Sequence, residues 1–193
     1  MSHWELSGGI YHVALHLADS IPADQLAAWC EKRAELALIR QRERREWTVA
    51  EVEEMKRAFQ RHMETYLSVG YGACLLRHPQ AADVVRETLL HGQGTSYGIH
   101  LWCVMPNHLH VIVKPYSDVS ITKVVADWKS VSAHRLMKLG LPEARTPVWM
   151  RDHYSRIIRT PEEYRRQVDY VWRNPESAGL SEGFARERYD GVE

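Results

Sequence analysis

The 193-residue chain is predicted to form an α+β fold in which an antiparallel sheet packs against helices. Two observations predict this class. Residues 11–17 and 97–114 alternate or are continuously apolar, as β-strands are, whereas most of the remaining chain has the 3.6-residue period of amphipathic helices. Strand and helix patterns are interleaved along the chain, which favours a single domain over residues 1–193.

The first predicted strand covers residues 11–17 and carries two histidines on one face. Its apolar residues fall on the opposite face, because side chains alternate along a strand. His12 and His16 are about 13 Å apart along an extended chain, too far to chelate one metal ion. We therefore interpret them as structural or substrate-facing residues.

Residues 23–46 and 48–67 are predicted to form two helices that are rich in glutamate and arginine. Thr48 fits the N-cap of the second helix, and the balanced charges suit exposed helices. Because a minimal version of the fold does not require this stretch, we interpret residues 23–69 as a helical insertion that either packs over the core or shapes a path for DNA.

The second half of the chain continues the alternation. Its predicted elements are a helix over 79–90, strands over 97–105 and 108–114, a helix over 119–139, a strand over 154–158, and a helix from the cap Thr160 to about Asn174, before Pro175. Core spacing in the helix over 119–139 selects Ile121, Val124, Val125, Trp128 and Val131. This order fits a ferredoxin- or RRM-like antiparallel sheet packed with helices, with residues 181–193 as a C-terminal tail.

His108 and His110 lie two residues apart in an apolar strand, so their side chains share one face. Burying two imidazoles costs free energy unless their ring nitrogens have partners. A shared divalent metal would be a partner for both. Ordinary hydrogen-bonded histidines on a half-exposed face are the commoner explanation of such a pair, and the spacing alone leaves the metal open as the alternative.

The last predicted helix presents Tyr170 away from its apolar stripe, which consists of Tyr164, Val168, Val171 and Trp172. The neighbours of Tyr170 at helical spacing are Arg166, Arg173 and Asn174, all polar. Because a tyrosine that only fills the core belongs on the stripe, this one is either an amphipathic surface residue or a functional phenol.

A phenol beside a metal and two arginines suits chemistry on a phosphate. A metal polarises a phosphate and stabilises the departing oxygen, and a phenol with a pKa near 10 needs such help to act as a nucleophile. Arg166 and Arg173 would donate to phosphate oxygens. The amide oxygen of Asn174, one turn after Tyr170, suits a third ligand to a hard cation.

These motifs resemble those of the REP-associated tyrosine transposases, within the wider His-hydrophobic-His nuclease group. The matching segments are 104–110, 128–130, Trp149, 152–159, 168–175 and 178–180. The resemblance implies that His108, His110 and Asn174 bind Mg²⁺ or Mn²⁺. It further implies that Tyr170 attacks single-stranded DNA and forms a 5′-phosphotyrosine, leaving a free 3′-hydroxyl.

The chain departs from the family pattern after Pro175. Where the family usually has Val-Lys-Ala-Gly, this chain has Glu176, Ser177, Ala178 and Gly179. The missing lysine would weaken phosphate contact near the end of the helix. The departure touches neither the proposed metal ligands nor the proposed nucleophile.

The net charge is zero, but the charges are unevenly distributed. Residues 105–175 contain 12 Lys and Arg against 7 Asp and Glu. This excess suits a phosphate-binding surface, although solvated helix faces would explain it as well. We expect Lys129, Arg166 and Arg173 to contact DNA. The aromatic residues with base stacking and core packing as alternatives are Tyr97, Trp102 and Trp149, with core packing favoured for Trp102.

We therefore predict a metal-dependent endonuclease and strand transferase that acts on single-stranded or hairpin DNA at palindromic repeats, as a monomer rather than a dimer. The alternatives are a noncatalytic nucleic-acid-binding domain of the same fold and a metal phosphodiesterase that uses water. The three cysteines have no paired spacing. With no signal-peptide pattern in residues 1–5 and no apolar run near ~20 residues, we expect a cytoplasmic protein without a membrane partner, at the nucleoid when bound to DNA.

Overall fold

The computed structural model describes residues 8–116, 118–180 and 185–189, which contain a five-stranded antiparallel sheet with the order β4-β1-β3-β2-β5. Its strands are β1 (Ile10–His16), β2 (Tyr97–Val104), β3 (His108–Pro115), β4 (Tyr154–Ile158) and β5 (Arg186–Arg188). The predicted α+β fold is confirmed, and the first four strands lie where the sequence predicts them. β1 and β3 are the inner strands from which the candidate site is built.

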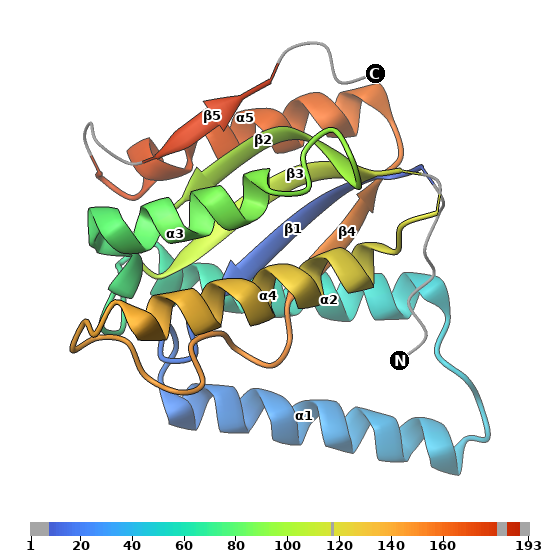
Figure 1. The fold of residues 1–193 in the computed structure, drawn as a ribbon. Helices are drawn as coiled ribbons and strands as arrows, with labels where there is room; N and C mark the ends of the chain where they lie inside the picture. The colour runs from blue at the N-terminus through green and yellow to red at the C-terminus, as the bar shows by residue number, and fades with distance from the viewer. Residues whose placement is uncertain (1–7, 117, 181–184, 190–193) are drawn as a thin grey trace.

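Helices cover both faces of the sheet (Figure 1). The helices α3 (Pro79–Leu90) and α4 (Ile121–Lys138) cover one face, and α5 (Pro161–Ser177) lies across the other. The helix α2 (Val49–Leu67) lies next to α5, whereas α1 (Ala23–Arg42) has no buried residue and stands apart from the sheet. A short 3₁₀ helix, η1 (Leu75–Arg77), precedes α3. Within the described residues, no helix is both long and apolar enough to cross a membrane.

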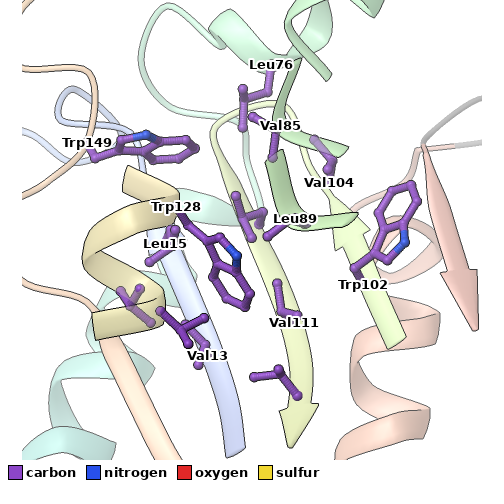
Figure 2. Close-up of a cluster of buried hydrophobic side chains, with 14 of the residues drawn as sticks. Val13, Leu15, Leu76, Val85, Leu89, Trp102, Val104, Val111, Trp128 and Trp149 are labelled. Carbon is purple, nitrogen blue, oxygen red and sulfur yellow. The ribbon is translucent and has the colours of Figure 1, made fainter. Parts of the chain in front are cut away.

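An apolar core fills the face of the sheet beneath α3 and α4 (Figure 2). Val13 of β1 and Val111 of β3 belong to the same buried cluster as Trp128 of α4. The Trp128 indole nitrogen donates a hydrogen bond to the Tyr97 hydroxyl at 2.8 Å, so burial leaves neither polar group without a partner. The predicted core role of Trp128 is confirmed.

Base stacking is wrong as a role for the three aromatic candidates. Tyr97, Trp102 and Trp149 are at most 5% exposed, and a buried ring cannot receive a base. The predicted core role of Val131 is also wrong, because that side chain is 48% exposed. The buried face of α4 continues instead through Ser132, whose hydroxyl accepts a hydrogen bond from the Trp149 indole at 2.9 Å.

The helix α5 continues past the end that the sequence predicts. Pro175 lies inside the helix, in its last turn, two residues before the final residue Ser177. A proline removes its own N–H donor but leaves its neighbours free to continue the helix. Accordingly, the backbone N–H of Ala178 donates to the Asn174 carbonyl at 3.1 Å.

The strand β5 was not predicted, and it changes the surroundings of α5. It pairs with the outer edge of β2, with Glu187 opposite Trp102. From β5, the guanidinium of Arg186 lies over the ring of Trp172, 4.3 Å from its centroid. Trp172 is 38% exposed, so its predicted place in the apolar stripe is wrong, and a cation–π contact covers it instead.

The helix α2 follows the N-cap Thr48, as predicted, and packs against the rest of the protein. The Thr48 hydroxyl accepts from the Glu51 backbone N–H at 3.2 Å, and the Glu51 carboxylate accepts from the Thr48 N–H at 3.0 Å. Near the other end of the helix, Met63 and Leu67 are buried in a cluster of hydrophobic residues. That residues 23–69 are an insertion into a smaller fold stays a prediction.

Candidate active site

Four histidines meet on the sheet face that α5 covers. In the antiparallel pairing of β1 with β3, His16 lies opposite His108, and Ala14 lies opposite His110. Directly opposed residues share a face, so His12, His16, His108 and His110 point the same way. All four are at most 2% exposed. Each histidine of β1 has a histidine neighbour on β3 rather than on its own strand: His110 beside His12, and His108 beside His16.

Asn107 orients the ring of His108. The Asn107 side-chain oxygen lies 2.8 Å from Nδ1 of His108, and its side-chain nitrogen donates to the Tyr71 carbonyl at 2.9 Å. Since that amide oxygen can only accept, Nδ1 of His108 carries the proton and Nε2 carries the lone pair. Among the described residues, the buried Nε2 of His108 has no hydrogen-bond partner.

His12 and Asn174 contact the two nitrogens of the His110 ring. Nε2 of His12 lies 3.0 Å from Nδ1 of His110. On the other side of the ring, the side-chain nitrogen of Asn174 lies 3.4 Å from Nε2 of His110. Asn174 is itself buried in α5. The outer nitrogen of His110 therefore faces the residue that the sequence predicts as the third ligand.

Burial keeps the histidines of this site neutral. Removal from water lowers the pKa of His12 to about 4 and that of His108 to about 3. Burial, and then electrostatic repulsion from the neighbouring His108 ring, lowers the pKa of His16 to about 3. Burial lowers the pKa of His110 well below 6.5. Neutral imidazoles at pH 7 have the lone pairs that a metal ligand requires.

The donor set fits a hard divalent cation when the amide is included. Among the described residues, no three His, Cys, Asp or Glu side chains are grouped to hold one ion. An ion here would therefore be held by His108, His110 and Asn174, with the amide turned so that its oxygen replaces the nitrogen. The unpartnered, buried Nε2 of His108 supports this fit, because an unsatisfied polar atom is costly in an apolar interior. That these residues bind a metal stays a prediction.

Tyr170 lies at the rim of the histidine cluster. Its ring centroid is 5.5 Å from that of His110 and 6.0 Å from that of His12, and the residue is 37% exposed. The hydroxyl donates a hydrogen bond to the carboxylate of Glu64 in α2. Burial, and then the negative charge of Glu64, raises the pKa of the phenol above its usual value. Tyr170 is thus a protonated phenol that faces both solvent and the candidate ligands.

The three predicted DNA-contact residues differ in their surroundings. Lys129 is not free: its ammonium donates to the backbone carbonyls of Met150 at 2.6 Å and Arg151 at 2.8 Å. Arg166 and Arg173 are exposed on α5 and form no ion pair within the part of the chain that the structure describes. The two arginines are therefore open to solvent, whereas the Lys129 ammonium is held by backbone carbonyls; that any of the three contacts DNA stays a prediction.

Sequence reasoning missed the contacts that three residues make with the predicted ones. His12 and Asn107 orient the candidate ligands, and Glu64 contacts the candidate nucleophile. Asn107 stood next to the histidine motif and was a detectable signal. His12 required the strand register, and Glu64 lies 106 residues from its partner with no motif around it.

Comparisons with known proteins agree with the geometry. The family described as "Transposase IS200 like" matches residues 81–168, which include both motif histidines and end just before Tyr170. A REP-associated tyrosine transposase of Escherichia coli (strain K12) is 27% identical over 84 residues, or 43% of this chain and 47% of that protein. Over this part of its length the chain is similar to the REP-associated tyrosine transposases.

The likeness to these transposases extends to the fold. A solved REP-associated tyrosine transposase bound to a REP hairpin superposes with a TM-score of 0.51 and 18% identity, covering 93% of this chain and 75% of that one. At 18% identity, this comparison shows that the two proteins share a fold and shows no more than that. The chain aligns with about half the length of the curated Escherichia coli relative.

Proposed function

We propose that the chain is a metal-dependent single-stranded DNA endonuclease and strand transferase with Tyr170 as its nucleophile. One observation carries the proposal: Tyr170 and Asn174, one turn apart on α5, both contact His110, whose neighbour His108 keeps a buried nitrogen without a partner among the described residues. A nucleophile and a set of ligands for a phosphate-binding cation therefore meet at one point. The transposase family match supports the same reaction class.

In the proposed cleavage reaction, three residues would hold the metal ion and Tyr170 would be the nucleophile. Bound at His108, His110 and Asn174, Mg²⁺ or Mn²⁺ would polarise the scissile phosphate and offset charge on the departing oxygen. Tyr170 attacks the phosphorus, and the bond to the 3′-oxygen breaks. The products are a 5′-phosphotyrosine and a 3′-hydroxyl, and the reverse reaction rejoins a strand.

Positively charged residues on α5 would hold the DNA strand. Arg166 and Arg173 lie one turn before and after Tyr170 and are exposed. Guanidinium groups donate two hydrogen bonds to a phosphate, so this pair can align the backbone along the helix. A continuous duplex would keep its strands away from the partly buried phenol, whereas a single strand beside a hairpin would reach it. The solved relative is described as bound to a REP hairpin, which supports the hairpin as substrate.

The test is the identity of the residue that becomes joined to DNA. Tyr170→Phe removes one oxygen, so folding and DNA binding should persist while the covalent adduct disappears. Tyr116→Phe is the matched control, because Tyr116 is also 37% exposed and lies away from the histidines. Mass spectrometry of the digested adduct should find the nucleotide on Tyr170. Cleavage without any adduct would favour the phosphodiesterase that uses water, and binding without cleavage would favour the noncatalytic domain.

A further inference from the structure

The carboxylate of Glu64 is the acceptor for the Tyr170 hydroxyl, and it comes from outside the motifs. Glu64 lies in α2, is half-buried, and accepts the phenolic hydrogen through Oε1. The same oxygen accepts a hydrogen bond from the side-chain amide of Gln60, one turn earlier, at 2.6 Å. Gln60 therefore orients the carboxylate toward the phenol.

The helix that carries Glu64 is anchored on both sides of it. Met63 next to it is fully buried, and Leu67 one turn later is 2% exposed, in a cluster with Ile21 and Met150. Eleven residues earlier, Glu53 accepts from the Arg159 guanidinium at 2.7 Å, which ties α2 to the start of α5. The position of Glu64 relative to Tyr170 is thus set by packing rather than by one flexible contact.

A proton acceptor is what this phenol needs in order to react. A phenol ordinarily has a pKa near 10 and is protonated at neutral pH, and the hydrogen of the Tyr170 hydroxyl is held by the Glu64 carboxylate. Attack on phosphorus therefore requires that the proton leave as the new bond forms.

We propose that Glu64 is a further catalytic residue, which accepts the Tyr170 proton during cleavage and returns it during rejoining; this rests on the proposed function. In cleavage, the hydroxyl proton passes to the Glu64 carboxylate while the bond from the phenolic oxygen to phosphorus forms. The bond from phosphorus to the 3′-oxygen breaks, and that oxygen takes a proton from water. In rejoining, a 3′-hydroxyl attacks and gives its proton to water, and Tyr170 leaves with the proton held on Glu64.

Glu64→Gln separates proton transfer from positioning. Glutamine keeps the length of the side chain and an oxygen that accepts the phenolic hydrogen bond, but it is a very weak base. If Glu64 accepts the proton, the single-turnover rate of adduct formation should fall about 100-fold or more, the usual range for a lost general base. Hairpin DNA binding and circular dichroism should be unchanged. Glu54→Gln, the same change on the exposed side of α2, is the matched control and should react at the wild-type rate.

Chemical rescue supplies a second measurement. In Glu64→Ala the acceptor is absent, and Tyr170 is exposed enough for a small carboxylate to approach. Added sodium formate should raise the adduct rate of Glu64→Ala in proportion to its concentration, and sodium chloride at equal ionic strength should not. This measurement decides the question if circular dichroism finds Glu64→Gln unfolded.

The outcomes separate this inference from the function on which it rests. A wild-type protein that forms no tyrosine adduct overturns both. A wild-type adduct on Tyr170, with Glu64→Gln reacting within threefold of the wild type or faster, overturns the role of Glu64 alone. Slow reaction of Glu64→Gln together with formate rescue of Glu64→Ala supports it.

Discussion

Asn107 and His12 determine which nitrogen each candidate ligand presents. Asn107 holds Nδ1 of His108, and His12 contacts Nδ1 of His110, so both rings direct Nε2 toward the space beside Asn174. Partners of this kind fix the tautomer and the orientation of metal-binding histidines. The His-x-His spacing identifies the pair from sequence, because it places two side chains on one face. The supporting partners follow only from the fold.

Removal of any candidate ligand should weaken metal binding. His108→Ala and His110→Ala should abolish cleavage at Mg²⁺ or Mn²⁺ concentrations that saturate the wild type, since each removes one of three protein ligands. Asn174→Ala should require more metal for the same rate. Calorimetric titration with Mn²⁺ measures the affinity, and chelator should stop the wild-type reaction. Undiminished cleavage by both histidine variants in chelator would exclude this site.

His12 should matter for metal affinity without being a ligand. His12→Gln removes the imidazole partner of His110 but keeps a polar side chain, so we expect a loss of about tenfold in Mn²⁺ affinity, the size usual for an orienting partner. Excess metal should restore the cleavage rate. His91→Gln, at an exposed position at the end of α3, is the control. An unchanged affinity in His12→Gln would mean that the contact with His110 does not orient it.

At the level of elements, the sequence predicts which helices and strands form better than it predicts where each of them ends. Apolar patterns located β1 to β4 and α3 to α5, each of which has buried residues, whereas balanced glutamate and arginine charges indicated α1 and α2. The end of α5 was misplaced, since Pro175 removes only one helical hydrogen bond in the last turn. The strand β5 has three polar residues and no hydrophobic pattern, so only its pairing with β2 reveals it.

The first turn of α5 should contribute measurably to stability, since this helix carries both Tyr170 and Asn174. The Thr160 hydroxyl accepts the backbone N–H of Glu163 at 3.1 Å, and Thr160→Ala removes that cap. The free energy of unfolding should fall by about 1 kcal/mol, as for other N-caps. Urea denaturation measures it. Thr65→Ala, in the last turns of α2 and exposed, should change it by less than about 0.5 kcal/mol. Equal effects of the two changes would contradict the capping role.

At the level of the whole molecule, the buried histidines should make the metal-free protein sensitive to acid. Their pKa values are about 4 for His12 and about 3 for His16 and His108, against 6.5 for an exposed histidine. Between these values the unfolded chain takes up protons that the folded chain does not. The free energy of unfolding should therefore fall as the pH is lowered below 6.5, by up to about 1.4 kcal/mol per pH unit for each histidine.

Urea denaturation at several pH values in chelator measures this slope. His16→Leu removes one of the buried imidazoles and should make the slope shallower, whereas His134→Gln, at an exposed position on α4, should leave it unchanged. A stability that is constant between pH 6.5 and pH 4.5 would show that the cluster does not remain neutral in the folded protein.

The charge of the whole chain predicts how it meets DNA. The net charge is zero, so binding depends on local groups such as Arg166 and Arg173 rather than on a general attraction. We expect hairpin and single-stranded DNA to be cleaved faster than a continuous duplex, and binding to weaken as salt rises, because each phosphate contact releases counterions. Arg166→Gln and Arg173→Gln should each reduce the salt dependence. Equal cleavage of a blunt duplex and its separated strands would contradict the expected substrate.

In the adjacent strands β1 and β3, residues that stabilise the fold alternate with residues of the candidate site. On β1 and β3, Val13 and Val111 face the apolar core, whereas His12 and His110 face the candidate site. Substitutions along these strands should therefore alternate in phenotype. Changes on the core side should reduce the amount of protein that accumulates in cells, while apolar replacements of the histidines should preserve abundance and abolish strand cleavage. Variants of this kind would be abundant but inactive. Over generations, a lineage could therefore lose the proposed cleavage activity and still keep the folded protein.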